Sequence, residues 1–552
     1  MTKADDLLDL YTELKSRKSQ YESHFEDIAR VQYPRRGGFS TPITEGERLQ
    51  DEIFDSTPQQ AARALANAVG SMTMPEGEQW VFVRAENDEL NRNEEALAWL
   101  ADSERRLRRA FDNPKSRFRI ATSEARLDLV CFGTAATFIG EGRDLRGLLF
   151  QTLNPKDFFL LSDADYTVDG LILRRDFTVR QAMQFFKDKA SQEVKDMFNE
   201  EKSRLKTVEH IHVIIPRTEM GFGSLSKQLP YTSIWIDVRA KQILTESGFN
   251  EFPFAVPRWD TTSGEEWGRS PGMIALPDSN SLQAVGETIL IAGHKKTEPP
   301  LLVPNDGTFN AGYTFPGGIT YYDAQLASEM GRIPIEALDT KGDLPVGLEI
   351  QQSLQQMVWN AFYRNVLALP PPQGTPMTAT EIMARKDEFL RELGEAFGRI
   401  ESEFTAPIVE RSFNIMLRAG AFAPIPEALQ GQNVRFEYES PIKKVREQNE
   451  ALAAKMWRVD LMETATMRPE VLHLLNADEY GRFQHTAGAL QYQIINSAEA
   501  VQQIREQEAQ AQLAQQQAQE AMMMAEGGKM AASAMKDVSQ AMKPDKPEKK
   551  AA

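Results

Sequence analysis

Two segments of the sequence predict a helical hairpin: LPDSNSLQAVGETILIAGHKKTEPP (276–300) and VGLEIQQSLQQMVWNAFYRNVLALPPPQG (346–374). In each segment, helix-forming residues are followed by consecutive prolines. Because a helix interior does not tolerate proline, each helix is expected to end there. We expect the first helix at 278–297, with Asp278 as its N-cap, and the second at 346–369. At 1.5 Å per residue each helix is roughly 30–35 Å long, so the pair is typical of a spacer that holds two ends of a protein apart.

The second helix has an apolar stripe along one side, with residues spaced by three and four. We expect this stripe to pack between helices. The intervening segment, 298–345, is rich in proline, glycine and β-forming residues, which predicts a small module at the tip of the hairpin. The stripe comprises Ile350, Leu354, Met357, Val358, Ala361, Phe362, Asn365, Val366, Ala368 and Leu369.

The bulk composition excludes several classes of protein. A chain of 552 residues that is 41% hydrophobic can bury cores in three or four domains. Its net charge of −17 argues against a protein that grips nucleic acid by neutralising phosphates, but is compatible with one that lets nucleic acid slide past. The single cysteine, Cys131, lies among apolar residues and is predicted to be buried, which leaves no disulfide within the chain. Without a signal peptide or a long apolar run, we expect a soluble intracellular or particle-associated protein and no membrane contact.

The rest of the chain mixes helices and strands. Short β runs between 145 and 260, with a hairpin-turn signal at Asp169-Gly170, predict an α+β domain of mainly antiparallel strands. Pro407 is expected to kink a long helix. The end of the chain, 526–552, is predicted to be disordered. Helices are expected at 3–33, from Asp55 or Ser56 to about 74, and at 92–112, 178–204, 378–419, most of 443–494 and 496–525, with strands at 79–83 and 434–438.

Motifs that carry enzymatic chemistry are missing or out of context. The sequence has no Walker-type phosphate-binding loop and no His-Glu-x-x-His motif. The segment GRSPG (268–272) matches Gly-x-Ser-x-Gly, but it lacks the preceding strand and following helix of a nucleophile elbow. We therefore expect Ser270 to lie in a loop that leads into the hairpin. The sequence predicts no enzyme, no catalytic residue and no cofactor.

Two sets of residues match metal sites only in part. His210 and His212 lie two apart in a predicted strand without a third ligand, which favours surface or interface histidines. Asp163, Asp165 and Asp169 lack the spacing and the final glutamate of a calcium loop, which favours carboxylates in a turn. No metal site is predicted.

Several motifs, in order along about 50–510, resemble those of the head-to-tail connecting (portal) proteins of short-tailed bacteriophages. Each motif is weak alone, but the ordered combination is specific. Acidic Glu76 and Glu78 replace the usual small or aromatic residue after the Pro75 turn. The motifs are FDSTPQQAA (54–62), MPEGEQW (74–80), FGTAA (132–136), GRSPG (268–272), ALPD (275–278), PPLLVP (299–304), MTATEI (377–382) and EAVQQIREQ (499–507).

The resemblance implies a predominantly helical α+β fold with portal architecture. That architecture has an α/β wing, a helical stem hairpin, a small α/β clip, a helical crown and a C-terminal helical barrel. Carried onto this chain, the wing is 1–275 with 378–440, the stem 276–298 with 346–369, the clip 299–345, the tunnel loop 370–377, the crown 441–495 and the barrel helix 496–525.

The resemblance also implies the function and the partners. Portal proteins form a ring of twelve subunits at one capsid vertex, around a channel through which double-stranded DNA is packaged, retained and ejected without sequence specificity. The implied partners are the terminase large subunit, a tail adaptor, and the major capsid and scaffolding proteins. The implied location is the virion, and the host cytoplasm during assembly.

The resemblance and the sequence together suggest candidate site residues. We expect the constriction of the channel at Pro370, Pro371, Pro372, Gln373, Gly374, Thr375 and Pro376, and docking of the adaptor at Pro299, Pro300, Tyr313, Phe315, Tyr321 and Tyr322. Lys295 and Lys296 could form a sparse cationic ring, or could merely stabilise a helix C-terminus through its dipole. The polar side of the second stem helix offers Gln352, Gln355, Gln356 and Arg364 as candidates for the lumen or the outer surface.

Alternatives remain at two points. The Ala- and Gln-rich C-terminal helix could pack closely against copies from other subunits, or stand as a single solvated helix. The function could instead be that of a ring-forming scaffold or adaptor without a DNA channel, or of a hydrolase that uses Ser270.

Overall fold

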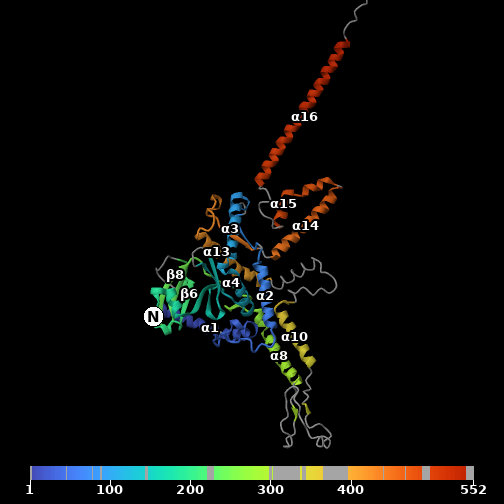
Figure 1. Ribbon diagram of the computed structural model, residues 1–552. Helices are drawn as coiled ribbons and strands as arrows, with labels where there is room; N and C mark the ends of the chain where they lie inside the picture. The colour runs from blue at the N-terminus through green and yellow to red at the C-terminus, as the bar shows by residue number, and fades with distance from the viewer. Residues whose placement is uncertain are drawn as a thin grey trace, which may run out of the picture. The chain divides into compact units, whose positions relative to one another are not determined.

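The computed structural model divides the chain into two compact units (Figure 1). The first comprises 1–87 and 98–445, and the second 88–97 and 446–552. None of the described helices has the length and apolar character needed to cross a membrane. The described residues are 3–44, 46–77, 79–87, 90–142, 147–219, 229–297, 301–302, 336–337, 344–364, 394, 396–438, 441–466, 468–487 and 498–541.

The first unit is an α+β arrangement, and the chain as a whole is predominantly helical, as predicted. Its helices are α1 (Lys3–Gln32), α2 (Thr57–Thr73), α3 (Glu94–Asp112, which begins in the second unit), α4 (Phe118–Phe132), α5 (Val179–Phe186), α6 (Gln192–Asn199), α7 (Pro271–Ile274), α8 (Leu276–Thr297), α10 (Leu344–Ala361) and α13 (Ala406–Arg418). Its strands are β1 (Val81–Ala85), β2 (Thr137–Glu141), β3 (Leu148–Thr152), β4 (Phe158–Ser162), β5 (Val168–Thr178), β6 (Thr207–Pro216), β7 (Tyr231–Asp237), β8 (Gln242–Phe249), β9 (Phe254–Ala255), β10 (Leu301–Leu302), β11 (Glu336–Ala337) and β12 (Val434–Tyr438).

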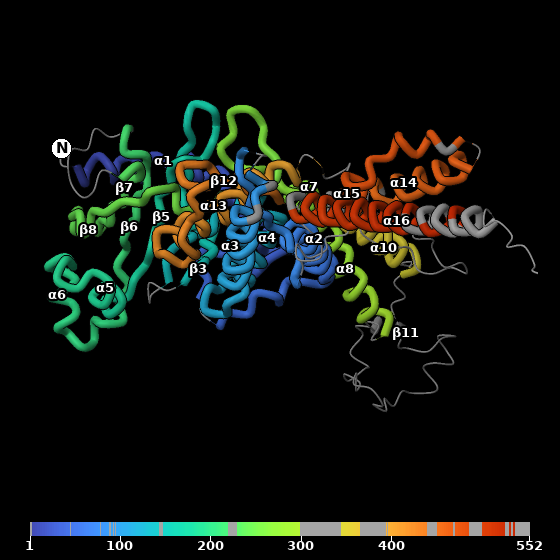
Figure 2. The backbone as a smooth tube through the Cα atoms, turned by 90° about the horizontal axis from the view of Figure 1, so that it is seen from above, coloured from blue at the N-terminus to red at the C-terminus, as the bar shows by residue number. Residues whose placement is uncertain are grey.

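Strands β4 to β8 form a five-stranded antiparallel sheet in which sequence neighbours pair, as the sequence predicts (Figure 2). One face packs against α1 through Tyr11 and the β6 residues Ile211 and Val213. The opposite face, which carries Val208 of β6, packs against α5 and α6. The remaining pairs are β3-β2-β9, β1-β12 and β10-β11, all antiparallel.

Two local predictions in this region are wrong. The single helix at 178–204 is broken, because Lys187 adopts φ +51 after α5 and Ser191 caps a new helix, α6. The turn signal at Asp169-Gly170 is overridden, since both residues lie inside β5. Gly170 leaves room for the paired strand, where Leu161 would lie 2.9 Å from an added Cβ. The turn itself is built by Asp163, whose carboxylate accepts hydrogen bonds from the backbone N–H groups of Asp165 and Thr167.

The main core of the first unit joins α1, α2, α4 and the three-stranded sheet. Aromatic rings fill its centre: Phe25 packs edge-on against Phe132 at 5.5 Å and against Trp267 at 5.7 Å between centroids. Cys131 is fully buried, which confirms the prediction, and this burial raises the pKa of its thiol. The chain entering the hairpin is therefore anchored beside the most aromatic part of the core.

The hairpin consists of α8 and α10, which run side by side (Figure 1). Gly347 permits their close approach, since an added Cβ would lie 3.2 Å from the Ile289 side chain of α8. The second helix ends at Ala361, earlier than predicted. Burial of Phe362 and the left-handed φ of +60 at Tyr363 end it, because packing against the core overrides helical periodicity here.

The kink predicted at Pro407 takes the form of a π-helical turn. Glu401–Thr405 is π-helical and α13 begins immediately afterwards, at Ala406. Pro407 has no backbone N–H to donate to the carbonyl of Glu403, four residues earlier. The regular helical hydrogen bond is therefore missing, and the helix is locally widened into a π turn. The Glu403 carboxylate then accepts from the backbone N–H of Arg258 at 2.8 Å and from its guanidinium at 2.6 Å, which joins this turn to the segment after β9.

The second unit is helical. Its helices are α14 (Pro441–Ala465, which begins in the first unit), α15 (Ala477–Ala487) and α16 (Ala498–Ala541). Arg505 of α16 donates to the Asp478 carboxylate of α15 at 2.6 and 2.8 Å. The predicted disordered tail is wrong as far as residue 541, because α16 continues through the Ala- and Met-rich segment whose residues favour helix.

Gly133 lets two backbone segments of the core cross, so replacing it tests that packing. It adopts φ +78 at the end of α4, and an added Cβ would lie 2.3 Å from the carbonyl oxygen of Gly268. We expect Gly133→Ala to lower the free energy of unfolding by about 2 kcal/mol or more, from the left-handed backbone and the clash together. Thermal unfolding measures this. Gly147→Ala, with open space around it, is the control, and equal melting temperatures for the two variants would contradict the assignment.

Candidate functional site: the polar junction at the base of the hairpin

A buried carboxylate joins the second hairpin helix, α10, to the start of α2. Asp55, which is 8% exposed, precedes α2 by two residues. Its Oδ2 atom accepts hydrogen bonds from Nε2 of Gln351 at 3.0 Å and of Gln355 at 2.7 Å, both on α10. Its Oδ1 atom accepts from the backbone N–H of Thr57 at 2.8 Å. One side chain therefore accepts from the first N–H of α2 and holds α10.

Gln283 of α8 completes the junction from the other helix. Its Oε1 atom accepts from the backbone N–H groups of Phe54 at 2.8 Å and Asp55 at 2.9 Å. Its Nε2 atom donates to the carbonyl oxygen of Asp55 at 2.7 Å. Gly286, one turn further along α8, allows the close approach, since an added Cβ would lie 3.1 Å from Phe54. Both hairpin helices are thus hydrogen-bonded to the same short segment, 54–57.

The surroundings of Asp55 favour its charged form. Burial raises the pKa of its carboxyl, but hydrogen bonds from Thr57, Gln355 and Gln351 more than offset burial and lower the pKa below its ordinary value. The junction corrects one sequence-based expectation. Gln355 was a candidate for the lumen or the outer surface, yet it faces inward and donates to Asp55. The described contacts leave Gln352 and Gln356 exposed.

The predicted site residues fall into two groups. Lys295 and Lys296 lie exposed in the last turn of α8, with His294, so three basic residues end that helix. All of the predicted constriction residues (Pro370 to Pro376) and docking residues (Pro299, Pro300, Tyr313, Phe315, Tyr321 and Tyr322) lie outside the described residues. In that part of the chain the structure shows only the antiparallel pair β10-β11.

Ser270 has a structural role at the entry to the hairpin. Its side chain is 1% exposed, and its Oγ atom donates to the carbonyl oxygen of Cys131 at 2.6 Å while accepting from the backbone N–H of Met273 at 3.0 Å. It is therefore the N-cap of α7, the short helix before α8. The expectation that no helix follows Ser270 is therefore wrong, because α7 begins directly after it. A buried hydroxyl that already donates to a backbone carbonyl is nevertheless not arranged as a nucleophile.

The two histidines of β6 are buried, which corrects the expectation of surface or interface residues. His210 is fully buried and its Nδ1 atom lies 3.0 Å from the carbonyl oxygen of Val208. His212 stacks on Trp235 at 4.1 Å between centroids and bonds the Ser233 hydroxyl at 2.8 Å. Burial, with Arg175 nearby, lowers the pKa of His212 to about 3. Within the described part of the chain, no group of three or more potential ligands could hold a metal ion.

Replacing Asp55 should weaken the junction in a pH-dependent way. Asp55→Ala leaves Gln351, Gln355 and the Thr57 N–H without their acceptor, which we expect to cost about 2–4 kcal/mol of unfolding free energy. Because the folded pKa of Asp55 is depressed, its contribution is fully present above the unfolded pKa of about 3.9 and is lost as pH falls through the folded pKa.

Melting temperatures of wild type and variant between pH 3 and 8 measure this effect. The difference should be constant above about pH 5 and shrink in acid. Asp51→Ala, at an exposed position before the junction, is the control. A difference that grows in acid, or that the control reproduces, would rule out the role given to Asp55.

Comparison with known proteins identifies the family. Residues 4–491 match the family model described as bacteriophage head to tail connecting protein. The chain is 28% identical over 516 residues to a probable portal protein of Bordetella phage BPP-1, covering 92% of this chain and 91% of the relative. It is also 28% identical to the portal protein of Salmonella phage epsilon15, covering 99% and 97%. A chain in which a polar junction anchors a helical hairpin, and which matches this model over nearly its whole length, belongs to the bacteriophage head-to-tail connecting, or portal, protein family.

Proposed function

We propose that the chain assembles into a dodecameric ring at one capsid vertex, with a central channel through which double-stranded DNA is packaged, retained and ejected. The observation that carries this proposal is the hairpin, which exposes several large apolar side chains in the single chain. Family membership supports the assignment, because the ring would connect the phage head to the tail.

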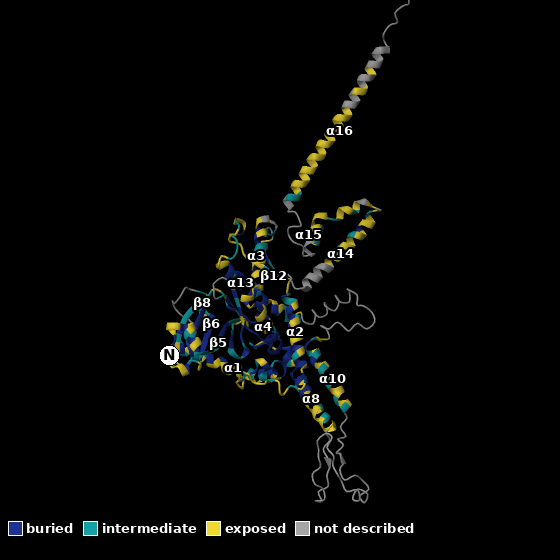
Figure 3. Ribbon diagram, in the orientation of Figure 1, coloured by how far each residue is buried: buried dark blue, intermediate teal, exposed yellow. Residues whose placement is uncertain are grey.

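Apolar residues of the hairpin are exposed where a neighbouring subunit would lie (Figure 3). Only part of the predicted stripe of α10 is buried: Val358 is covered, while Ile350 is 47% and Met357 49% exposed. On α8, Leu290 and Ile291 are 50% and 47% exposed. Val346 and Leu348, at 49% and 46%, continue the apolar surface of α10. Burying such residues between subunits would stabilise a ring by the hydrophobic effect.

Helix α16 supports a C-terminal barrel made of one helix per subunit. Ala511, Ala514, Ala518 and Ala521 recur at spacings of three and four, and all are exposed in the single chain. Small residues in such a stripe let helices approach closely, whereas they give an isolated helix little to bury. This pattern favours close packing with copies over a single solvated helix.

Charge suits a channel that must not bind the DNA it passes. Twelve chains at −17 carry about −204 in all, which disfavours adhesion of phosphates to the walls. Lys295 and Lys296, at the end of α8, would add a sparse ring of positive charge that centres the DNA through weak, salt-sensitive attraction. Their position in the last helical turn also suits the helix dipole, so both roles fit the same residues.

The remaining parts of the architecture follow the same proposal. The wing would be 1–275 with 378–440, the stem 276–298 with 346–369, the clip 299–345, the crown 441–495 and the barrel the start of α16. The terminase large subunit would dock during packaging, a tail adaptor would later dock at the clip, and the major capsid and scaffolding proteins would surround the wing. The ring would form in the host cytoplasm and remain in the virion.

Two other functions compete with this proposal. A ring-forming scaffold or adaptor would share the apolar hairpin faces but would enclose no channel. A hydrolase that uses Ser270 is disfavoured, because that hydroxyl is buried and caps α7. Ser270→Ala should therefore destabilise the entry to the hairpin rather than abolish a reaction.

Charging the exposed apolar face of α10 should prevent assembly. Native mass measurement should give twelve times 62.2 kDa, about 746 kDa, for wild type. Ile350→Glu places a carboxylate in the proposed interface and should shift the mass toward the single chain. Gln352→Glu, on the opposite side of the same helix, is the matched control and should leave the ring intact. A ring unaffected by Ile350→Glu, or equally lost in both variants, would exclude this face as the contact.

Shortening the loop 370–377 by three residues should separate assembly from DNA retention. We expect rings of normal mass, because the loop lies outside the proposed subunit contacts. Filled heads should lose their genome, because the constriction would widen. Packaged DNA protected from nuclease measures retention, and normal retention in rings of normal mass would argue against a constriction at this loop.

A further inference from the structure

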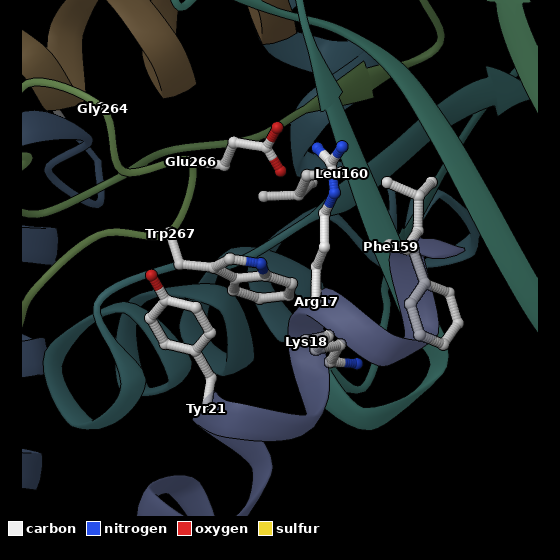
Figure 4. A pocket seen from close by; sticks show the side chains of 9 residues that line it. Arg17, Lys18, Tyr21, Phe159, Leu160, Gly264, Glu266 and Trp267 are labelled. Atoms are coloured by element: carbon white, nitrogen blue, oxygen red, sulfur yellow. The ribbon is translucent and has the colours of Figure 1, made fainter. Parts of the chain in front are cut away.

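A small pocket lies between α1, β4 and the loop before Trp267, and none of the residues of the hairpin junction lines it (Figure 4). Its volume is about 180 Å³. Phe159 and Trp267 are buried and form its apolar walls, while Arg17, Tyr21 and Glu266 stand nearer the surface. Pockets that hold cofactors or drug-sized molecules usually measure roughly 300–1,000 Å³. This pocket is smaller, and its size suits a single side chain of another protein.

Glu266 is the acidic group that lines the pocket. The neighbouring carboxylates are paired: Glu13 accepts from Arg17 at 2.6 Å, and Glu265 forms an ion pair with Arg269. Among the described residues, by contrast, no hydrogen bond or ion pair reaches the Glu266 carboxylate. Half-burial raises the pKa of Glu266, and the nearby positive charge of Arg17 only partly offsets this rise. A cation entering the pocket would satisfy this group.

The aromatic walls already hold one cation. Nζ of Lys18 lies 4.5 Å from the ring centroid of Phe159 and 5.3 Å from that of Trp267. Lys18 donates to the backbone carbonyls of Pro155 at 2.6 Å and Phe158 at 3.0 Å, and Figure 4 shows its amine pointing away from Glu266. Burial lowers the pKa of Lys18 to about 7, which weakens its repulsion of a second cation near neutral pH.

Arg17 is the group that opposes a second cation. Figure 4 shows its guanidinium on the same side of the pocket as the Glu266 carboxylate. Arg17 is 62% exposed and paired with Glu13 one turn earlier on α1, so it can remain with that partner when the pocket fills. Its removal should therefore strengthen the binding of a cation and weaken the binding of an anion.

We propose that this pocket is a docking site for a lysine or arginine side chain of a partner protein, with Glu266 as its counter-ion, Phe159 and Trp267 as its aromatic walls and Tyr21 at its rim. Arginine and aromatic contacts in small, partly dry pockets dominate the energy of many protein interfaces. The strongly acidic chain, with a net charge of −17, adds long-range attraction for a basic partner. The site lies on the first unit and does not depend on the proposed channel.

Ligand-observed NMR on the full chain tests the site with N-acetyl-arginine amide and, in parallel, N-acetyl-aspartate amide. We expect only the arginine derivative to bind. Glu266→Gln should weaken its binding at least tenfold, and Arg17→Gln should strengthen it. Glu193→Gln removes the same charge on α6, outside the pocket, and should change nothing. Circular dichroism confirms that each variant is folded.

Three results would overturn the proposal. These are no binding of the arginine derivative to wild type, equal binding by Glu266→Gln and wild type, and preferential binding of the aspartate derivative that Arg17→Gln abolishes. The last result would assign the pocket to an acidic partner instead. Ring assembly, measured by mass, is expected to be normal in Glu266→Gln. Failure of the pocket proposal can therefore be distinguished from failure of the proposed ring.

Discussion

The hairpin keeps its place on the first unit through the carboxylate of Asp55. Its partners, Gln351 and Gln355, lie 296 and 300 residues away in the sequence. The side chain of Gln283, 228 residues away, bonds the backbone of the same segment. A buried carboxylate that accepts from three donors is directional, so it fixes the register of α10 against the start of α2, while the Gln283 side chain does the same for α8. In the proposed ring, this junction would be one route by which a force on the hairpin reaches the core of the wing.

Much of the fold could be predicted from local patterns. The helix α1, the strand β12 and most strands of the five-stranded sheet follow from the spacing of apolar residues and from composition, because these elements have local sequence patterns that match their secondary structure. Predictions failed where tertiary packing overrode the local signal. Asp169-Gly170 looks like a turn but lies in β5, because the neighbouring strand needs the space beside Gly170.

The junction could not be predicted because each of its residues has a more common explanation. Asp55 precedes a helix and looks like a cap, which it also is. Gln351 and Gln355 lie on the polar side of an amphipathic helix and look like solvated surface. These residues form one group only because the folded chain brings together segment 54–57, α8 and α10, which are distant in the sequence. The pocket at Glu266 was missed for a related reason, because an acidic residue in a polar loop carries no signal of burial.

The proposed channel depends on whether copies of this chain close into a ring around an open centre. End-on electron microscopy of the purified full-length chain tests this most directly. The account predicts twelve-fold rings with a central hole, lined by the hairpins and continued by the C-terminal helices. A single chain, or an oligomer with a filled centre, would contradict it and would favour a scaffold or adaptor without a channel.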